Sequence, residues 1–245
     1  MRASVSIAVL GALLATGCRA DTTAEEDAQR VKFPLRDDFP TGAAGSAPTP
    51  GTYQLLADPD RSHLAIQVFA ANDTLGHDHV IRAKNWTGSV TFTWPDLSTC
   101  SVQLTLPVSE LAVDEDDMRT LVGYDDKMSA DQRQQVKGHM EAKNQLDAAN
   151  HKEITFAGSS CVDTGARGAG GHPLINVNGR LTIRGASKDV TLPLEVAASN
   201  GTLAARGRLT ATHTDFGFQP YLDAGGLFAN KDELYFVIDV RGQQQ

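Results

Sequence analysis

Apolar and polar residues alternate along most of the chain from Tyr53 onward. Alternation with a period of two is typical of β-strands, because successive side chains point to opposite faces. Each alternating segment has one apolar and one polar face, which favours antiparallel strands, since strands of a parallel sheet are usually apolar on both faces. The pattern predicts an all-β domain of about nine strands, built as a sandwich or as a barrel closed on its apolar face. The clearest segments are 64–69, 90–94, 102–108, 175–183, 190–196, 203–211 and 234–240.

One segment departs from this pattern and predicts a surface helix over about 130–146. Ser129 and Gln132 have the spacing of a capping box, which marks the start of a helix. Val136, Met140 and Leu146 follow at helical spacing, and so narrow an apolar stripe places the helix on the surface. Residues 121–128 are expected to form a short helical turn or a loop. The acidic run 114–117 is interpreted as a solvated loop, because it lacks the regular spacing of a calcium site.

The first 50 residues are predicted to lie outside the folded domain. Residues 7–15 form an apolar stretch that is too short to span a bilayer as a mature helix. Small residues follow it and precede Cys18, as in a bacterial lipobox. Residues 1–18 are therefore interpreted as a signal peptide with Cys18 as the lipidation site, and an ordinary secretory signal is the alternative. Residues 19–50 are acidic at first, then rich in Pro and Gly, and are expected to form a flexible tether.

Both interpretations place the protein in the periplasm or cell envelope, anchored to a membrane if Cys18 carries lipid. The chain has three cysteines, so lipidation of Cys18 would leave Cys100 and Cys161 as a pair. A disulfide is expected in an oxidising compartment, and two buried thiols are the alternative. The formal net charge of -8, without a basic stripe, argues against nucleic acid as a partner.

Several short motifs resemble the YceI-like, polyisoprenoid-binding family. The most specific are the runs 179–185 (GRLTIRG) and 188–192 (KDVTL), followed by 214–218 (TDFGF), and the similarity extends over residues 51–241. The resemblance implies a lipocalin-like antiparallel β-barrel over residues 51–243, with the one surface helix. It also implies a lumen that takes a long isoprenoid chain, a polyisoprenoid or a quinone-like lipid, without a chemical reaction.

The cluster His77-Asp78-His79 is the most distinctive group of titratable residues. On an extended chain the two histidines would share one face, with Asp78 on the other. They are interpreted as capping a strand at the lip of the barrel; contact with a polar headgroup is one alternative. Half of a metal site is another, although nothing in the spacing supplies a third ligand. The aromatic candidates for contact with a ligand are Trp86, Phe216, Phe218, Tyr221 and Phe228.

These observations predict a binding protein rather than an enzyme, because the sequence has no Ser-His-Asp order, Walker loop or HExxH zinc motif. The expected function is an exported, membrane-tethered barrel that binds an isoprenoid-type lipid in its lumen, for transport or sequestration. No cofactor other than the lipid is expected, and the oligomeric state is open. The alternatives are a metal-assisted hydrolase or redox enzyme using His77 and His79, and a structural or partner-binding envelope protein.

Overall fold

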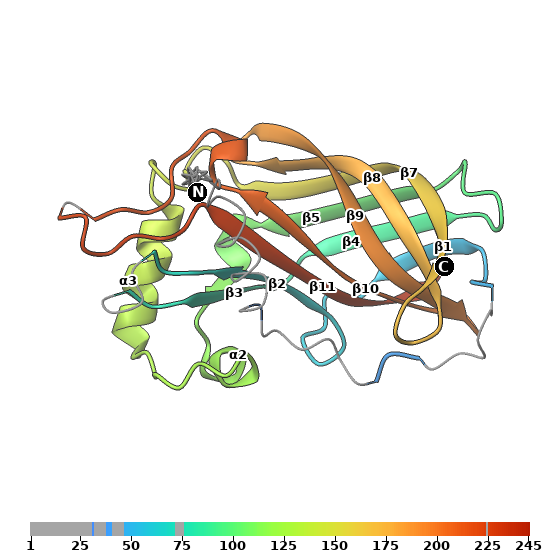
Figure 1. The fold of residues 1–245 in the computed structure, drawn as a ribbon, viewed down its shortest axis with the longest axis horizontal. Coiled ribbons are helices and arrows are strands. Elements are labelled where there is room, and N and C mark those ends of the chain that lie inside the picture. Colours follow the sequence, from blue (N-terminus) through green and yellow to red (C-terminus); the bar gives the residue numbers. More distant parts are fainter. Residues whose placement is uncertain (1–30, 32–37, 41–46, 72–75, 224) are drawn as a thin grey trace, which may run out of the picture. The chain divides into compact units, whose positions relative to one another are not determined.

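The computed structural model describes Val31 and residues 38–40, 47–71, 76–223 and 225–245, which belong to one compact unit (Figure 1). No helix among these residues combines the length and the apolar composition needed to cross a bilayer. The helices are α2 (Asp116–Leu121) and α3 (Ala130–Glu141), with 3-10 turns at Val108–Glu110 and Thr214–Phe216. The strands are β1 (Gly51–Leu55), β2 (His63–Val68), β3 (His79–Ala83), β4 (Thr87–Phe92), β5 (Ser101–Pro107), β6 (Leu111–Val113), β7 (Glu153–Arg167), β8 (Pro173–Ile183), β9 (Ala186–Ser199), β10 (Thr202–Thr212) and β11 (Glu233–Gln244).

The strands form a closed antiparallel barrel. They pair in the order β1-β4-β5-β7-β8-β9-β10-β11, and β11 closes the ring on β1, with Tyr53 opposite Gln244. The alternation in the sequence turns one face of each strand inward, so that Val177 and Leu181 of β8 are buried while Arg180 is exposed. The predicted all-β barrel is confirmed, and the sandwich is not formed.

The ring opens at the end of the barrel where the helices lie. There β11 leaves β1 and pairs with β2, which pairs with β3, and β3 pairs with β6. Within the part of the chain that the structure describes, no ladder joins β6 to β7. Helix α3 packs against β6 instead, and its Val136 and Met140 side chains pack against the core. This end of the barrel is therefore covered by side chains rather than by backbone hydrogen bonds.

The predicted helix is confirmed at its start, but it ends at Glu141 rather than at residue 146. Ser129 and Gln132 form the predicted capping box, through N–H donation at 3.2 Å and 2.8 Å. Ala142 is extended (φ -63°, ψ 159°), and the following turn brings the Leu146 N–H to the Met140 carbonyl at 3.0 Å. The spacing of Leu146 therefore comes from a turn that packs it on the core, which imitates helical periodicity.

The prediction of a solvated loop at 114–117 is wrong. Asp114 is fully buried, and Asp116 and Asp117 form the first turn of α2. Acidic side chains are favoured there because the helix N-terminus carries partial positive charge. Glu115 also accepts a hydrogen bond from Arg82 Nε of β3 at 2.9 Å, so the run is tied to the barrel. After α2, residues 122–129 form a loop. A loop was one of the two forms predicted for residues 121–128.

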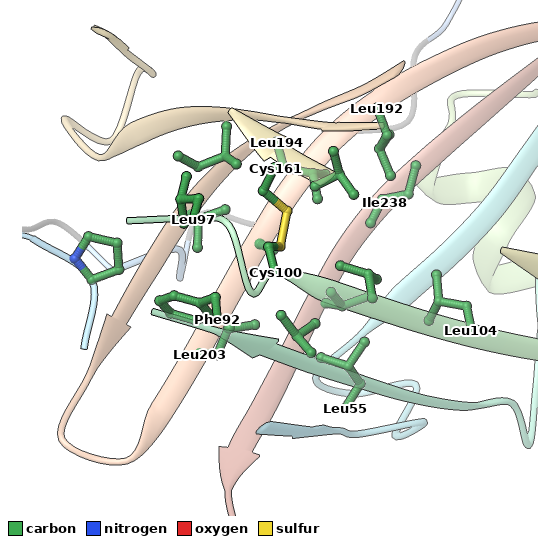
Figure 2. A pocket seen from close by; sticks show the side chains of 18 of the residues that line it. Leu55, Phe92, Leu97, Cys100, Leu104, Cys161, Leu192, Leu194, Leu203 and Ile238 are labelled. Carbon is green, nitrogen blue, oxygen red and sulfur yellow. A yellow bond between two sulfur atoms is a disulfide. The ribbon is translucent and has the colours of Figure 1, made fainter. Parts of the chain in front are cut away.

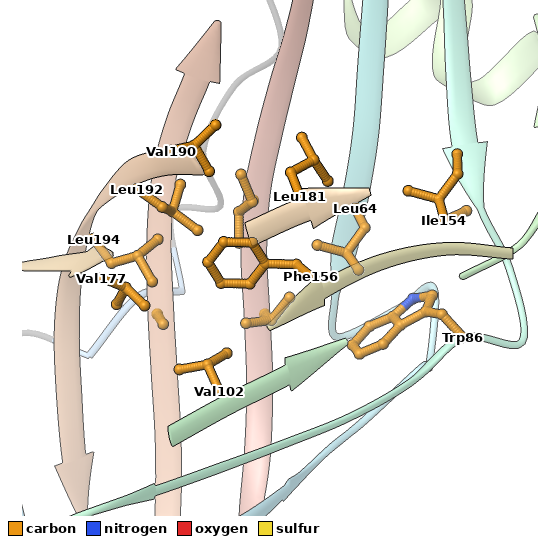
Figure 3. Close-up of a cluster of buried hydrophobic side chains, with 14 of the residues drawn as sticks. Leu64, Trp86, Val102, Ile154, Phe156, Val177, Leu181, Val190, Leu192 and Leu194 are labelled. Carbon is orange, nitrogen blue, oxygen red and sulfur yellow. The ribbon is translucent and has the colours of Figure 1, made fainter. Parts of the chain in front are cut away.

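One apolar core fills much of the barrel, and the predicted disulfide links two neighbouring segments of the barrel wall. Phe156 of β7 lies at the centre of a cluster that includes Leu64 and Trp86 (Figure 3). Strands β5 and β7 pair with Val102 opposite Gly158, which brings Cys100 and Cys161 to a Cα separation of 5.7 Å. Their sulfurs are bonded. The pairing expected from the cysteine count is confirmed.

Three parts of the predicted tether fall within the described residues, Val31 and residues 38–40 and 47–50, and all lie against the barrel domain. Phe39 is buried against Ala197 and Ala204, and the Arg206 guanidinium lies 4.1 Å from the centre of its ring. Thr49 donates its N–H to the Ala198 carbonyl at 2.7 Å. These residues are therefore held on the outer face of the barrel. Cys18 and the predicted signal peptide lie outside the described residues.

Candidate functional site

The largest of three cavities lined by described residues lies at the helical end of the barrel and has a volume of about 570 Å³. This volume falls in the range of small-molecule sites. Strands β2, β3, β6 and β11 supply apolar side chains to its wall, and α3 supplies both apolar and polar ones. Its polar lining comes from residues that are far apart in the sequence: His77, His79, Gln132, Gln135, His139, Gln145, His213, Tyr221, Asp223 and Asn230.

Two smaller cavities continue along the interior, each of about 60 Å³. The middle one shares Ile66, Leu111 and Ile154 with the large cavity. It shares Leu104 and Leu192 with the third, which lies beside the disulfide (Figure 2). Their linings are almost entirely apolar. The three cavities therefore form a series, wide and partly polar at the helical end and narrow and apolar toward the disulfide.

A network of charged side chains, buried at Asp114 and Arg119 and half exposed at His77 and Asp126, supports one wall of the large cavity. His79 Nδ1 lies 2.6 Å from Asp114 Oδ2, and the other oxygen of Asp114 accepts from Arg119 at 3.0 Å. Arg119 also binds Asp126, whose second oxygen lies 2.8 Å from His77 Nδ1. One arginine thus joins two carboxylates, and each carboxylate holds one histidine of the wall.

This network fixes the orientation of both imidazoles. Asp114 also accepts from the Val80 N–H at 3.0 Å, so every group around it is a donor and it acts as an acceptor only. Partial burial alone would raise the pKa of Asp126, but Arg119 and then His77 lower it, and its net pKa lies below the usual aspartate value. Each histidine must therefore donate from Nδ1, which leaves Nε2 without a hydrogen bond from another described residue, on a side chain that lines the cavity.

A third histidine of the cavity wall, His213, is also oriented through its Nδ1, here by a backbone carbonyl. His213 is buried, and its Nδ1 donates to the Asp232 carbonyl at 2.8 Å. Its ring meets Phe218 edge to face, with 5.2 Å between the ring centres. Burial is the main cause that lowers the pKa of His213 below its usual value. The ring is therefore neutral near pH 7, with Nε2 unprotonated.

Residues 56–240 match the YceI-like domain family, which covers nearly the whole barrel. The protein belongs to the YceI-like family. Among solved structures it is similar to BcnA of Burkholderia cenocepacia, with 19% sequence identity, a TM-score of 0.56 and coverage of 76% of this chain and 98% of that chain. It is also similar to a polyisoprenoid binding domain from Saccharophagus degradans, with 12% identity, a TM-score of 0.52 and coverage of 80% and 100%. At these identities the likeness shows a shared fold. No curated protein matches the chain.

Five of the seven ligand-contact candidates line the large cavity of this YceI-like barrel. They come from three separate segments and are His77, His79, Phe218, Tyr221 and Phe228. The interpretation of the histidines as strand caps predicts hydrogen bonds from their rings to loop backbone. Both Nδ1 atoms meet carboxylates instead. Asp78 accepts from the Ala70 N–H at 3.0 Å. Contact of the five with a ligand stays a prediction.

The other two candidates, Trp86 and Phe216, line none of the three cavities. Trp86 is buried between β3 and β4, where it packs into the core cluster (Figure 3). Phe216 is also buried in that cluster, on the 3-10 turn after β10. Both aromatic rings fill the interior of the barrel. Their assignment to a ligand site is therefore replaced by a role in the core.

Several cavity residues were not recognised from the sequence. Gln132, Gln135 and His139 reach the cavity because α3 covers the open end of the barrel. The only signal was the helical spacing that groups His139 with Val136 and Met140. The partners Asp114 and Arg119 gave no signal, because they meet His79 only through the fold.

A metal-dependent enzyme built on His77 and His79 would need a third metal-binding side chain close to both histidines. Among the described residues, no group of three or more His, Cys, Asp or Glu side chains is arranged to hold a metal ion. The two histidines are instead held by different carboxylates, Asp126 and Asp114.

The lowered pKa of His213 predicts a loss of stability on mild acidification. Below the usual value of 6.5, the unfolded chain takes up a proton that the buried ring does not, so the free energy of unfolding falls as the pH falls. Urea unfolding at about pH 7.5 and about pH 5.5 measures this loss. In a His213→Asn variant the difference between the two pH values should be smaller. An unchanged difference would assign the pH dependence to other groups.

Proposed function

We propose that this YceI-like barrel binds an isoprenoid-type lipid, with its tail in the narrow apolar lumen and its polar end in the large cavity. The series of three cavities supports the proposal, because its polar groups are confined to the large cavity and the two narrow ones are apolar. A molecule with one polar end and one branched hydrocarbon tail has the same polarity. The fold that the chain shares with a polyisoprenoid binding domain is consistent with this ligand class.

The lumen offers a long tail the apolar contacts that it needs. Side chains such as Leu104, Leu192 and Ile238 line two adjoining cavities, so a tail passing between them stays out of water (Figure 2). Burial of each CH₂ group is worth about 0.8 kcal/mol. The narrow cavities are smaller than the large one, so the tail must displace side chains as it enters. A role in binding, without a reaction, is part of the proposal.

Filling the inner cavity should weaken binding of long tails. Ala205 lines the cavity beside the disulfide, and Ala205→Phe would place a ring there. Overpacking of this size should reduce affinity for a long isoprenoid roughly tenfold. Native mass spectrometry of the purified protein, with extraction of copurified lipid, identifies the ligand and its tail length. Titration then compares long and short isoprenoids.

The matched control is Ala157→Phe, which adds the same ring at an exposed position of β7 on the outside of the barrel. It should leave affinity unchanged. A short isoprenoid that reaches only the large cavity should bind Ala205→Phe normally, which also confirms that this variant is folded. Equal affinity of all three proteins for long tails would contradict a ligand tail in the lumen.

We propose further that the barrel is exported and tethered to a membrane through lipid on Cys18, where it would carry or sequester its ligand. The apolar stretch before Cys18 and the Cys100–Cys161 disulfide support this proposal, since disulfides persist in oxidising compartments. Wild-type protein should sediment with membranes, and Cys18→Ala should not. Equal sedimentation of the two would contradict the tether.

A further inference from the structure

The large cavity holds many hydrogen-bonding groups but no cationic side chain of Lys or Arg. Among the described residues that line it, the only formal charge outside the histidines is the carboxylate of Asp223. Asp223 is held at the mouth by the N–H groups of Leu227 and Phe228, at 2.9 Å and 3.2 Å. Sites for phosphate normally supply Arg, Lys or a helix N-terminus. This cavity therefore lacks the side-chain charge that an anionic head would require.

Two nearby cations, Arg119 and Arg184, are engaged elsewhere. Arg119 lies behind the histidines and faces two carboxylates, so the Asp114-Arg119-Asp126 group has an excess of negative charge. Arg184 does not line the cavity, and its Nη2 donates to the Lys143 carbonyl at 3.0 Å. The wall carrying the histidines consequently presents a negative background to any anion in the cavity.

The three fixed histidines add a directional requirement. The Nδ1 atoms of His77, His79 and His213 donate to a carboxylate, a carboxylate and a carbonyl, respectively. In the neutral ring the remaining Nε2 is an acceptor. No hydrogen bond from another described residue reaches these Nε2 atoms. A complementary ligand must therefore bring a donor, which a hydroxyl does and a phosphate dianion, a carbonyl or an ether does not.

We infer that the large cavity recognises an uncharged hydroxyl group at the polar end of the isoprenoid and discriminates against a phosphorylated end. The inference rests on the proposed lipid-binding function and names the class of its head: an isoprenoid alcohol. Gln135 adds an amide group that donates to the hydroxyl oxygen while the histidines accept its hydrogen. The Gln145 amide also lines the cavity, and its Nε2 donates to the Gln219 carbonyl at 3.1 Å. The specificity comes from fixed imidazole tautomers together with the absence of a cation in the lining.

Three probes with one tail test the inference: farnesol, farnesyl methyl ether and farnesyl phosphate. Each displaces the same fluorescent lipid from the full-length protein at about pH 8, where an ordinary imidazole is neutral. Farnesol should bind about tenfold more tightly than the ether, which leaves the histidines without a donor. The affinity for farnesol should exceed the affinity for farnesyl phosphate by at least about tenfold, because the phosphate is also repelled by the negatively charged wall.

The outcomes separate the head inference from the lipid-binding function. Tighter or equal binding of the phosphate would overturn the exclusion of anions, and equal binding of the ether would overturn the requirement for a donor. Both results would leave lipid binding intact. Failure of all three probes to displace the fluorescent lipid would contradict the lipid-binding function and the inference with it.

A single added cation should change the specificity. Gln135 lies on the exposed side of α3 and lines the cavity, so Gln135→Lys would place an ammonium group at its edge. Binding of farnesyl phosphate should strengthen about tenfold, and farnesol should change little. The control is Gln134→Lys, because the neighbouring Gln134 is exposed but does not line the cavity. This variant adds the same charge to α3 outside the cavity. Equal gains in both variants would indicate a general charge effect and overturn the assigned position of the head.

Discussion

Asp114→Asn is expected to lower the free energy of unfolding by about 3–5 kcal/mol, which is typical when one partner of a buried ion pair is removed. Asp114 is fully buried and binds three donors, from His79, Val80 and Arg119. The neutral amide would leave the buried guanidinium with less compensation and would place donors against donors. Urea unfolding monitored by circular dichroism measures the change.

The control for this substitution is Asp117→Asn. Asp117 pairs with Arg82 at 2.9 Å, but its side chain is 65% exposed. Exposed ion pairs contribute little, so its loss should cost less than about 1 kcal/mol. If the two variants were equally stable, the network behind His77 and His79 would not hold the cavity wall in the way described. Farnesol affinity should also fall in Asp114→Asn, because His79 would lose the acceptor that fixes its tautomer.

Removal of the disulfide is expected to cost about 4 kcal/mol, from the entropy of closing a loop of this length. Cys100 and Cys161 are 61 residues apart, and the loop between them contains both helices. The double variant Cys100→Ala/Cys161→Ala should unfold at lower urea concentration than the oxidised wild type. Unfolding of the wild type with a reductant should match the variant.

The reductant provides the internal control, because it should leave the double variant unchanged. A wild type that keeps its full stability after reduction would show that native packing, rather than the covalent link, holds β5 on β7. The same experiment tests function, since the disulfide borders the innermost cavity (Figure 2). Loss of affinity for long tails, with short tails unaffected, would place the end of the tail at the disulfide.

Local patterns in the sequence were sufficient for the strands and for the start of the helix, whereas the choice of a barrel over a sandwich came from the resemblance to the YceI-like family. Alternation in segments such as β8 determines which face is buried, and the Ser129–Gln132 capping box is complete within four residues. The end of the helix was mispredicted because Leu146 reaches the core through a turn. Trp86 and Phe216 were assigned to the ligand because aromatic side chains serve a core and a cavity equally well.

The cavity wall depends on contacts that no local pattern contains. His79 and Asp114 are 35 residues apart, and Arg119 meets the loop at Asp126 only after α2 has formed. Asp114 also has a positive φ of 51°, which aspartate tolerates better than most residues but which the sequence does not mark. An acidic run usually indicates solvent exposure, and here the first of its carboxylates is the least exposed.

The missing ladder between β6 and β7 has a consequence for exchange with solvent. Where β11 pairs with β1, each strand of the ring has two hydrogen-bonded neighbours, so its amides open only when the barrel itself comes apart. At the other end, within the described residues, α3 is held on β6 mainly by side chains. Deuterium uptake should therefore be fast along α3 and slow along β10 and β11. Local opening at this end should therefore cost a small fraction of the free energy needed to unfold the barrel, and the proposed ligand would enter there.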